Sequence, residues 1–297
     1  MIHFHSDHYF HIGRAHTASG KPCQDYAISA HNEKSALAII ADGCSSGGNT
    51  DVGARLITLA TAAAITWKKR GPQEINRIRA RCMRKISRSL FLKNSDLLAT
   101  CAYAYLTKNS GFIHILGDGA VALKYRTGRI VFYRFDWDNN MPAYAAYADD
   151  SFHGFIAAHG GDPLLTALKR EKYVYMPENG FSATETEFYT TAEGIEGMTI
   201  PITPIDIFVG LEYVAVFSDG VDQVEDIEWK DVIIRLLSFK NITGEFAKRR
   251  MIRFIKESQE IGKGPLDDIA YAVIHIAQDE RKEDCDDADK ESDKSNP

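Results

Sequence analysis

The chain has 297 residues, of which 44% are hydrophobic and 26% are charged, and its formal net charge is −6 at pH 7. This is the composition of an ordinary globular protein, long enough for one large domain or two small ones. The acidic balance argues against a nucleic-acid-binding protein, so we expect no nucleic-acid partner.

Three further features bear on location. The start of the chain, residues 1–10, is polar and rich in histidine and does not resemble a signal peptide. The stretch of lowest charge, residues 52–67, is interrupted by Arg55 and is not expected to span a membrane. The five cysteines show neither paired spacing nor a Cys-x-x-Cys motif, which indicates reduced thiols and a cytoplasmic protein without a membrane partner. These cysteines are Cys23, Cys44, Cys82, Cys101 and Cys285.

The first third of the chain is predicted to fold as two strands followed by two helices. Short apolar strands at 26–30 and 36–40 are joined by a polar hairpin, and a glycine-rich loop follows. Apolar residues at helical spacing then predict a helix over 52–67 and, after Gly71-Pro72, a second helix. The second helix carries a basic face, which we interpret as solvated, with a docking surface for an acidic partner as the alternative. Its residues are Arg77, Arg79, Arg81, Arg84, Lys85 and Arg88.

The rest of the chain is predicted to be mainly β-structure. Four strands with turn residues between them, from 98 to 135, indicate an antiparallel meander. Residues 136–180 have no clear pattern beyond an expected helix at 163–172. The remaining expected elements are strands at 181–190, 213–217 and 269–277 and helices at 231–239 and 245–261. From Gln278 onward nine acidic and four basic residues occur without an apolar period, which predicts a disordered tail over 278–297.

Four aspartates stand at the ends of apolar strands. Asp42, Asp118 and Asp219 each follow such a run and precede a glycine, whereas Asp267 comes just before the last strand. A single Asp-Gly pair is usually an ordinary turn. Four carboxylates in this shared context are better explained by a hard divalent cation such as magnesium or manganese, because clustered carboxylates repel one another without one. The pattern therefore predicts a metal site built by strands that are distant in sequence.

Taken in order, these motifs resemble those of the bacterial type 2C protein phosphatases, a metal-dependent serine/threonine class. The resemblance extends over residues 12–276 and depends on the whole series, since each motif alone is weak. The matching segments are Gly13-Arg14-Ala15-His16, Gly20-Lys21-Pro22-Cys23-Gln24-Asp25, Ala41-Asp42-Gly43, Gly117-Asp118-Gly119-Ala120, Ser218-Asp219-Gly220-Val221 and Asp267-Asp268-Ile269-Ala270.

The resemblance implies a set of metal ligands. Asp42 would bridge two ions, the carbonyl of Gly43 would complete one of them, and Asp219 and Asp267 would bind the other. Asp25 would hold a water molecule on the metal, and Asp118 with Asp219 would contact a third, weaker ion. The implied cofactors are therefore Mn²⁺ or Mg²⁺, two or three in number, which activate water for attack on phosphorus.

The sequence also departs from the family pattern. Gly20 stands where many members carry an arginine that grips the substrate phosphate, so Lys21, Arg14 or His16 would have to supply that charge. His16 is alternatively a general acid for the leaving oxygen or a structural histidine. Asp268 replaces an asparagine and adds negative charge near the metals, which would either tighten them or leave them unaffected. Cys23 and Cys44, next to these motifs, are interpreted as buried, inert thiols.

We therefore expect an α/β sandwich with two central antiparallel β-sheets flanked by helices and a metal cleft at one edge. The phosphatase domain would occupy residues 1–277, with 136–180 as a variable insertion that, together with 201–210, selects the substrate. The expected activity is hydrolysis of phosphoserine or phosphothreonine in proteins, with a phosphorylated protein, a kinase or its substrate, as partner. Two alternatives stay open: a catalytically weak or inactive module that binds a phosphoprotein, and a metal-dependent phosphohydrolase of a small molecule.

Overall fold

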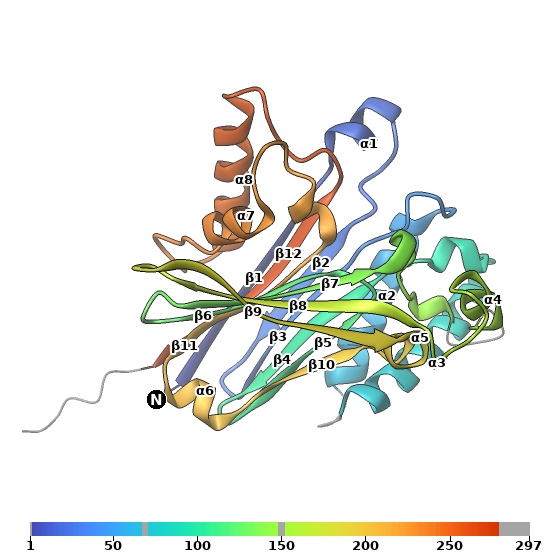
Figure 1. Ribbon diagram of the computed structural model, residues 1–297, viewed down its shortest axis with the longest axis horizontal. Helices are drawn as coiled ribbons and strands as arrows, with labels where there is room; N and C mark the ends of the chain where they lie inside the picture. The colour runs from blue at the N-terminus through green and yellow to red at the C-terminus, as the bar shows by residue number, and fades with distance from the viewer. Residues whose placement is uncertain (1, 67–70, 148–151, 279–297) are drawn as a thin grey trace, which may run out of the picture.

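Two antiparallel β-sheets packed face to face form the centre of the molecule (Figure 1). The computed structural model describes residues 2–66, 71–147 and 152–278. The predicted disordered tail lies outside these residues from 279 onward. The expected fold, two antiparallel sheets with flanking helices, is confirmed.

The larger sheet has seven strands in the order β1-β12-β11-β6-β7-β8-β9, and the smaller has five in the order β10-β5-β4-β3-β2. The strands of the larger sheet are β1 (Ile2–His11), β6 (Gly119–Tyr125), β7 (Ile130–Trp137), β8 (Thr166–Met176), β9 (Gly180–Thr190), β11 (Leu211–Phe217) and β12 (Ile269–Gln278). The strands of the smaller sheet are β2 (Tyr26–His31), β3 (Ser35–Ala41), β4 (Cys101–Thr107), β5 (Gly111–Leu116) and β10 (Met198–Ile202).

Helices cover the outer face of each sheet. The α-helices are α1 (Arg14–Ser19), α2 (Thr50–Thr66), α3 (Pro72–Ser89), α4 (Phe152–Ala158), α5 (Thr191–Ile195), α6 (Pro204–Phe208), α7 (Trp229–Leu236) and α8 (Phe246–Gln259). Short 3₁₀ helices are η1 (Asn94–Leu97), η2 (Asp138–Asn140), η3 (Ala145–Tyr147) and η4 (Asp219–Asp222). Within the described residues, no helix combines the length and the apolarity that crossing a bilayer requires.

Alternation along the strands explains the layers. In β3, Ala36, Ala38 and Ile40 face the other sheet, while Leu37 and Ile39 pack against the α2–α3 layer. Strand β12 does the same, with two alanines and two isoleucines toward the smaller sheet and Ile269, Tyr271 and Val273 toward α7 and α8. Since strand side chains alternate between faces, a strand buried on both faces reads as a continuous apolar run. The small residues between the sheets allow them to approach closely.

Two of the expected elements are wrong. Residues 163–172 are not a helix, because β8 runs from Thr166 to Met176 and pairs with β7 and β9. The charged residues of β8 form cross-strand ion pairs, Arg170 with Glu187 and Lys172 with Glu185. These pairs stabilise the hairpin of β8 and β9.

The expected meander is also wrong, because it divides between the two sheets. Strands β4 and β5 pair within the smaller sheet, and β6 and β7 pair within the larger one. The chain passes from one sheet to the other at residues 117–118. Gly117 and Gly119 have φ of 104° and 116°, a conformation that L side chains rarely adopt, and this permits so short a crossing. Asp118 therefore lies between the sheets rather than in a hairpin turn.

Candidate metal centre

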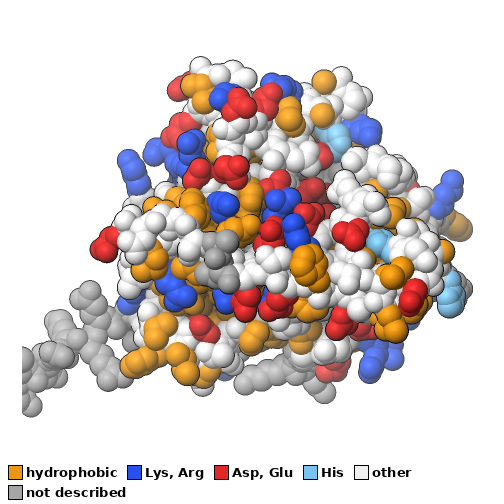
Figure 2. All heavy atoms as spheres, in the orientation of Figure 1, with side chains coloured by type: hydrophobic (Ala, Val, Ile, Leu, Met, Phe, Trp, Pro, Cys, Tyr) orange, Lys and Arg blue, Asp and Glu red, His pale blue; other side chains and the backbone are white. Residues whose placement is uncertain are grey.

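The strand ends bring five aspartates to the same end of the sandwich. Asp25 precedes β2, Asp42 follows β3, Asp118 joins β5 to β6, Asp219 follows β11, and Asp267 precedes β12. Because consecutive strands run antiparallel, strand ends and strand starts meet at one edge. All of these aspartates except Asp25 line a cleft of about 340 Å³. Figure 2 shows acidic side chains gathered in a hollow near the middle of the face it presents.

Asp25 lies beneath the cleft rather than in its wall. Its side chain is buried, with one oxygen, Oδ2, accepting a 2.7 Å hydrogen bond from the Ser218 hydroxyl and the other, Oδ1, without a partner. Burial raises the pKa of Asp25 well above its ordinary value, against the hydrogen bond from Ser218, and the charges of Asp268 and Asp219 add to the rise. A buried carboxylate with an unpartnered oxygen points to a missing cationic partner.

Burial and repulsion between negative charges also raise the pKa values of the neighbouring carboxylates. The pKa of Asp42 is raised well above its ordinary value by burial and then by the charges of Asp25 and Asp219. Burial and the charge of Asp219 raise the pKa of Asp118 to about 8. None of the described residues that line the cleft is a lysine or an arginine. This oxygen-rich set fits Mg²⁺ or Mn²⁺, which would relieve the repulsion.

Two residues to which the sequence assigned no role, Gln223 and the motif residue Ser218, support this cluster. The side-chain amide of Gln223 donates to Asp219 Oδ2 at 3.3 Å and to Asp267 Oδ2 at 3.4 Å, so it ties the two carboxylates together. The Ser218 hydroxyl donates to Asp25 and accepts from the backbone N–H of Ala270 at 2.9 Å. Ser218 could have been found as the residue before Asp219, whereas nothing in the sequence marks Gln223.

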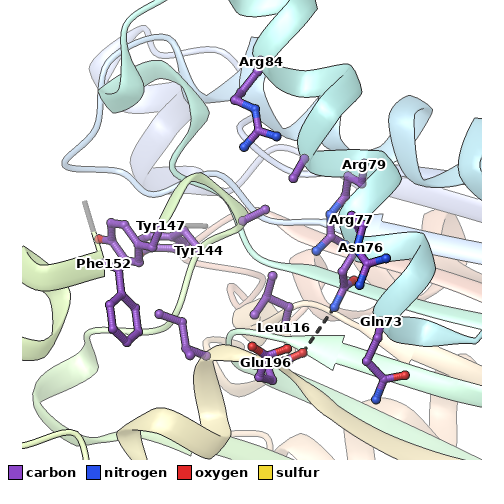
Figure 3. A pocket seen from close by; sticks show the side chains of 13 residues that line it. Gln73, Asn76, Arg77, Arg79, Arg84, Leu116, Tyr144, Tyr147, Phe152 and Glu196 are labelled. Atoms are coloured by element: carbon purple, nitrogen blue, oxygen red, sulfur yellow. Dashed lines mark hydrogen bonds between the residues drawn. The ribbon is translucent and has the colours of Figure 1, made fainter. Parts of the chain in front are cut away.

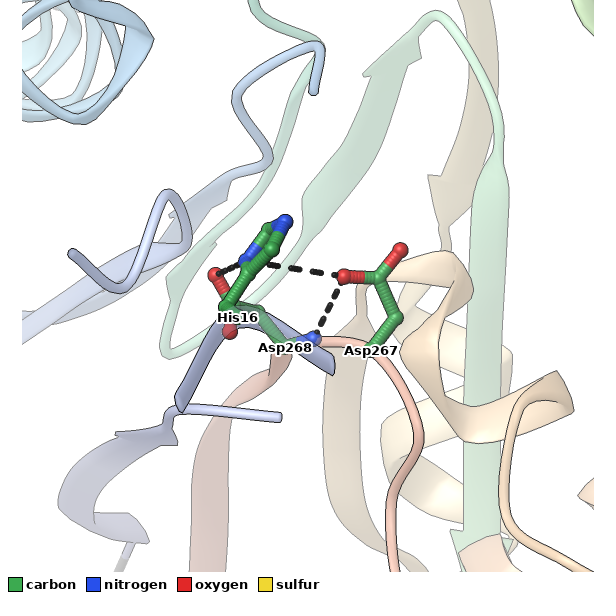
Figure 4. A group of neighbouring side chains, drawn as sticks. All are labelled: His16, Asp267 and Asp268. Carbon is green, nitrogen blue, oxygen red and sulfur yellow. Dashed lines mark hydrogen bonds and ion pairs between the residues drawn. The ribbon is translucent and has the colours of Figure 1, made fainter. Parts of the chain in front are cut away.

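His16 and Asp268 form a buried pair beside the metal carboxylates (Figure 4). Nδ1 of His16 lies 2.8 Å from Asp268 Oδ2 and 3.7 Å from Asp267 Oδ1. The two carboxylate oxygens of Asp268 also accept the backbone N–H groups of Gly13 and Gln24. The fixed Nδ1 leaves the other ring nitrogen, Nε2, as the one available to the cleft that His16 lines.

These contacts identify what Asp268 does in place of asparagine. It fastens both ends of the segment from Gly13 to Gln24, which carries α1, to the start of β12. We expect Asp268→Asn to lower the free energy of unfolding by about 1–2 kcal/mol, because one amide N–H would then face a donor instead of an acceptor. Denaturant unfolding without metal measures this change. An unchanged free energy of unfolding would contradict this anchoring role.

Lys21 and Arg14, the predicted phosphate-gripping residues, are not among the residues that line the cleft. The Arg14 guanidinium donates to Glu225 at 2.7 Å. The ammonium group of Lys21 donates to the carbonyl of Ser45 at 3.2 Å, and Ser45 itself lines the cleft. Lys21 therefore contacts a residue of the cleft lining, and the role of Lys21 or Arg14 in holding phosphate stays a prediction.

The two cysteines next to the motifs differ. Burial, reinforced by the charge of Asp25, raises the pKa of Cys23, as expected for an inert thiol. Cys44 lines the cleft and is only partly buried, and hydrogen bonds with Ser46 and Tyr144 outweigh the effect of burial, so its pKa is lowered. Cys44 is therefore not fully buried as expected, and its reactivity stays a prediction.

The raised pKa of Asp118 leads to a prediction about the metal-free protein. A carboxyl whose pKa rises from 3.8 to about 8 on folding favours the fold below 3.8 and loses that contribution as pH rises through 8. In chelator, we expect the unfolding midpoint of the wild type to fall between pH 6 and 9. Asp118→Asn should be more stable than wild type at pH 9 by about 1–3 kcal/mol, a figure reduced for solvent screening.

Thermal unfolding at pH 6 and 9, with chelator and with saturating manganese, measures this effect. The sign should reverse with metal, because the wild type gains binding energy that the variant partly loses. A variant less stable than wild type at pH 9 in chelator would contradict the argument.

Comparisons with known proteins agree with this geometry. The family model described as protein phosphatase 2C matches residues 12–139. A comparison with curated protein sequences found no match.

Among solved structures, the serine/threonine phosphatase Stp1 from Staphylococcus aureus is 14% identical with a TM-score of 0.52, covering 92% of this chain and 95% of its own. The catalytic domain of the serine threonine protein phosphatase PstP, solved with two manganese ions, is 16% identical with a TM-score of 0.52, covering 94% and 100%. The S. agalactiae serine/threonine phosphatase is 15% identical with a TM-score of 0.52, covering 92% and 99%. At these identities the likeness establishes the fold.

Proposed function

We propose that this chain hydrolyses phosphoserine or phosphothreonine in proteins with the help of manganese or magnesium, on the basis of the protein phosphatase 2C model that matches residues 12–139 and of the fold shared with solved phosphatases. The observation that carries the proposal is the cluster of carboxylates with raised pKa values around one cleft. A hydrolase that uses a metal-activated water needs such a cluster and no covalent nucleophile.

The resemblance suggests how these residues would share two ions. Asp42 would bridge two ions, Asp219 and Asp267 would hold one of them, and the carbonyl of Gly43 would complete the other. Asp118, with Asp219, would contact a third, weaker ion. When bound, the divalent ions lower the pKa of a water nucleophile and neutralise the phosphoryl oxygens. Gln223 keeps Asp219 and Asp267 together in the absence of metal.

His16 supplies the proton that the leaving oxygen needs. Its Nδ1 is held by Asp268 at 2.8 Å, so the ring cannot turn away and Nε2 is the nitrogen available to the cleft. A serine or threonine alkoxide is a poor leaving group, and its departure is helped by a positioned acid. We assign to His16 the roles of general acid and of a hydrogen-bond donor to phosphate, in a cleft whose described lining contains no arginine or lysine.

The substrate is a phosphorylated protein, a kinase or a kinase substrate, whose phosphorylated residue enters the cleft. Asn140, Pro142 and Tyr144 line the cleft and belong to the segment 136–180, which supports a role for that segment in substrate selection. Residues 201–210 contribute the end of β10 and helix α6, away from the cleft lining. A cytoplasmic location is consistent with the four described cysteines, all of which are free.

Hydrolysis of para-nitrophenyl phosphate and of a phosphothreonine peptide, with manganese, magnesium or chelator, tests the proposal. Metal-dependent release of phosphate from the peptide is the expected result. Turnover of para-nitrophenyl phosphate and small phosphates without turnover of phosphopeptides would favour a small-molecule phosphohydrolase. Folded protein that binds metal and a phosphopeptide but turns over neither substrate would favour a binding module.

A further inference from the structure

A second and larger cavity lies beside the metal cleft. Its volume is about 620 Å³, which is within the range of small-molecule binding sites. Figure 3 shows its two walls: arginines project from α3 on one side, and the aromatic rings of Tyr144, Tyr147 and Phe152 lie on the other. Tyr144 also lines the metal cleft, so the two spaces are neighbours.

Arg79 is the unusual residue of this cavity. Its side chain lines the cavity and is 2% exposed, and its Nε and Nη1 atoms have no hydrogen-bond partner. No ion pair connects it to any carboxylate in the part of the chain that the structure describes. The expectation that the basic face of α3 is solvated is therefore wrong for Arg79. A buried cation without a counter-charge is costly, and natural proteins rarely keep one without a use for it.

The surroundings of Arg79 do not compensate its charge. Burial, together with the charge of Arg79, lowers the pKa of His114 to about 3. The neutral His114 ring lies 2.9 Å from the Thr199 hydroxyl and 3.2 Å from the Asn76 amide nitrogen. The buried hydroxyl of Tyr103 also has no partner. The exposed Glu196 is the one acidic side chain in the described lining, and no ion pair joins it to Arg79.

We propose that this cavity binds an anionic group, a phosphate or a carboxylate, through Arg79, with Arg77 and Arg84 at its entrance. Those two arginines are exposed and also line the cavity, so three guanidinium groups face one space. Arginine pairs with phosphate and carboxylate through parallel N–H donors, which would satisfy the unpartnered atoms of Arg79. The aromatic wall suits the apolar or aromatic part of the same ligand.

The anionic group can come from two sources. It belongs either to a second acidic or phosphorylated residue of the substrate bound in the neighbouring metal cleft, or to a free small molecule. The assignment of the anion to the substrate rests on the proposed phosphatase function. The existence of an anion site does not. The experiment therefore measures anion binding without turnover first.

The first measurement is thermal unfolding of the full chain in chelator, titrated with phenylphosphonate, a non-hydrolysable probe, at constant ionic strength. We expect a saturable rise of the midpoint in wild type. Arg79→Met should raise the midpoint of the ligand-free protein, because it removes an unpaired buried charge, and should weaken the probe at least about tenfold. Arg84→Met, a change at an exposed position that should not disturb folding, should weaken it less.

Arg81→Met is the matched control, since Arg81 is exposed on the same helix and does not line the cavity. It should respond to phenylphosphonate as the wild type does. A wild type with no saturable response, or Arg79→Met and Arg84→Met variants that both respond like wild type, would overturn the proposal.

Peptide hydrolysis then separates the two sources. Phosphothreonine peptides with a glutamate or a phosphoserine at successive positions are compared with a neutral peptide. Loss of a preference for the acidic peptides in Arg84→Met, with turnover of the neutral peptide unchanged, assigns the site to the substrate. If Arg84→Met weakens the phenylphosphonate response but keeps the preference for acidic peptides, the site is assigned to a free ligand.

Discussion

Asp42→Asn and Asp219→Asn are each expected to lower manganese-dependent kcat at least about a thousand-fold, since a catalytic metal contributes several kcal/mol to transition-state stabilisation and each 1.4 kcal/mol is a factor of ten. Asparagine keeps the shape of the side chain but cannot supply the charge that holds a divalent ion. The folded structure should survive, because each substitution removes a repelling charge from the cluster. The measurement is kcat with para-nitrophenyl phosphate together with manganese content.

Asp136→Asn provides the matched control. Asp136 is 43% exposed, lies within ion-pair distance of Arg134 and Lys169, and does not line the cleft. Its kcat should stay within a few-fold of wild type, because exposed ion pairs contribute little. Equal losses in all three variants would indicate general damage, and full activity of Asp42→Asn would sink the assignment of the metal centre.

His16→Gln should separate two substrates by the quality of their leaving groups. With a phosphothreonine peptide, kcat should fall about a hundred-fold, because the alkoxide loses its proton donor. With para-nitrophenyl phosphate the fall should be less than about tenfold, because nitrophenolate leaves without a proton. Steady-state kinetics on both substrates, from pH 6 to 9, gives the comparison.

The size of the difference between substrates tests the role of His16. Equal losses of kcat on both substrates would show that His16 acts through the structure of the cleft or through the metal and not as an acid. A rise in KM with an unchanged kcat would assign it to phosphate binding alone. Manganese affinity should be measured on the same variant, since His16 lies 3.7 Å from Asp267.

The sequence predicted the convergence of the aspartates from local patterns, whereas the sandwich was implied by the resemblance of the motifs to a known family. Continuous apolar runs mark strands that are buried on both faces, as β3 and β12 are. The aspartates stand where such strands begin or end, so they lie at the same edge of the sandwich. The order of the motifs then led to the correct fold. No comparable pattern marks Gln223. It contacts two carboxylates because the 3₁₀ helix η4, which it directly follows, places its side chain at the cleft.

The errors arise where tertiary context overrides local signals. The charges of β8 have a helical composition but pair across a hairpin. The basic residues of α3 read as one solvated face, yet Arg79 faces inward because α3 packs on the smaller sheet through Ile75 and Met83, its neighbours on the helix. Asp268 does add charge beside the metal aspartates, but its contacts with two backbone N–H groups and with His16 were not foreseen. Each error required knowledge of a partner distant in sequence.

The two-residue crossing at Asp118 has a consequence for the whole molecule. Asp42 comes from the smaller sheet, Asp219 and Asp267 come from the larger, and Asp118 lies on the strand connection between them. Ions held by these aspartates would link the two sheets at one end. The described cysteines are free, so no disulfide bond between them provides such a link. The separation of the ligand oxygens is then fixed by the thickness of the alanine-rich layer between the sheets. A larger side chain introduced between the sheets would change the spacing of the ligand oxygens. It would thereby alter the activity, even when every residue of the cleft is unchanged.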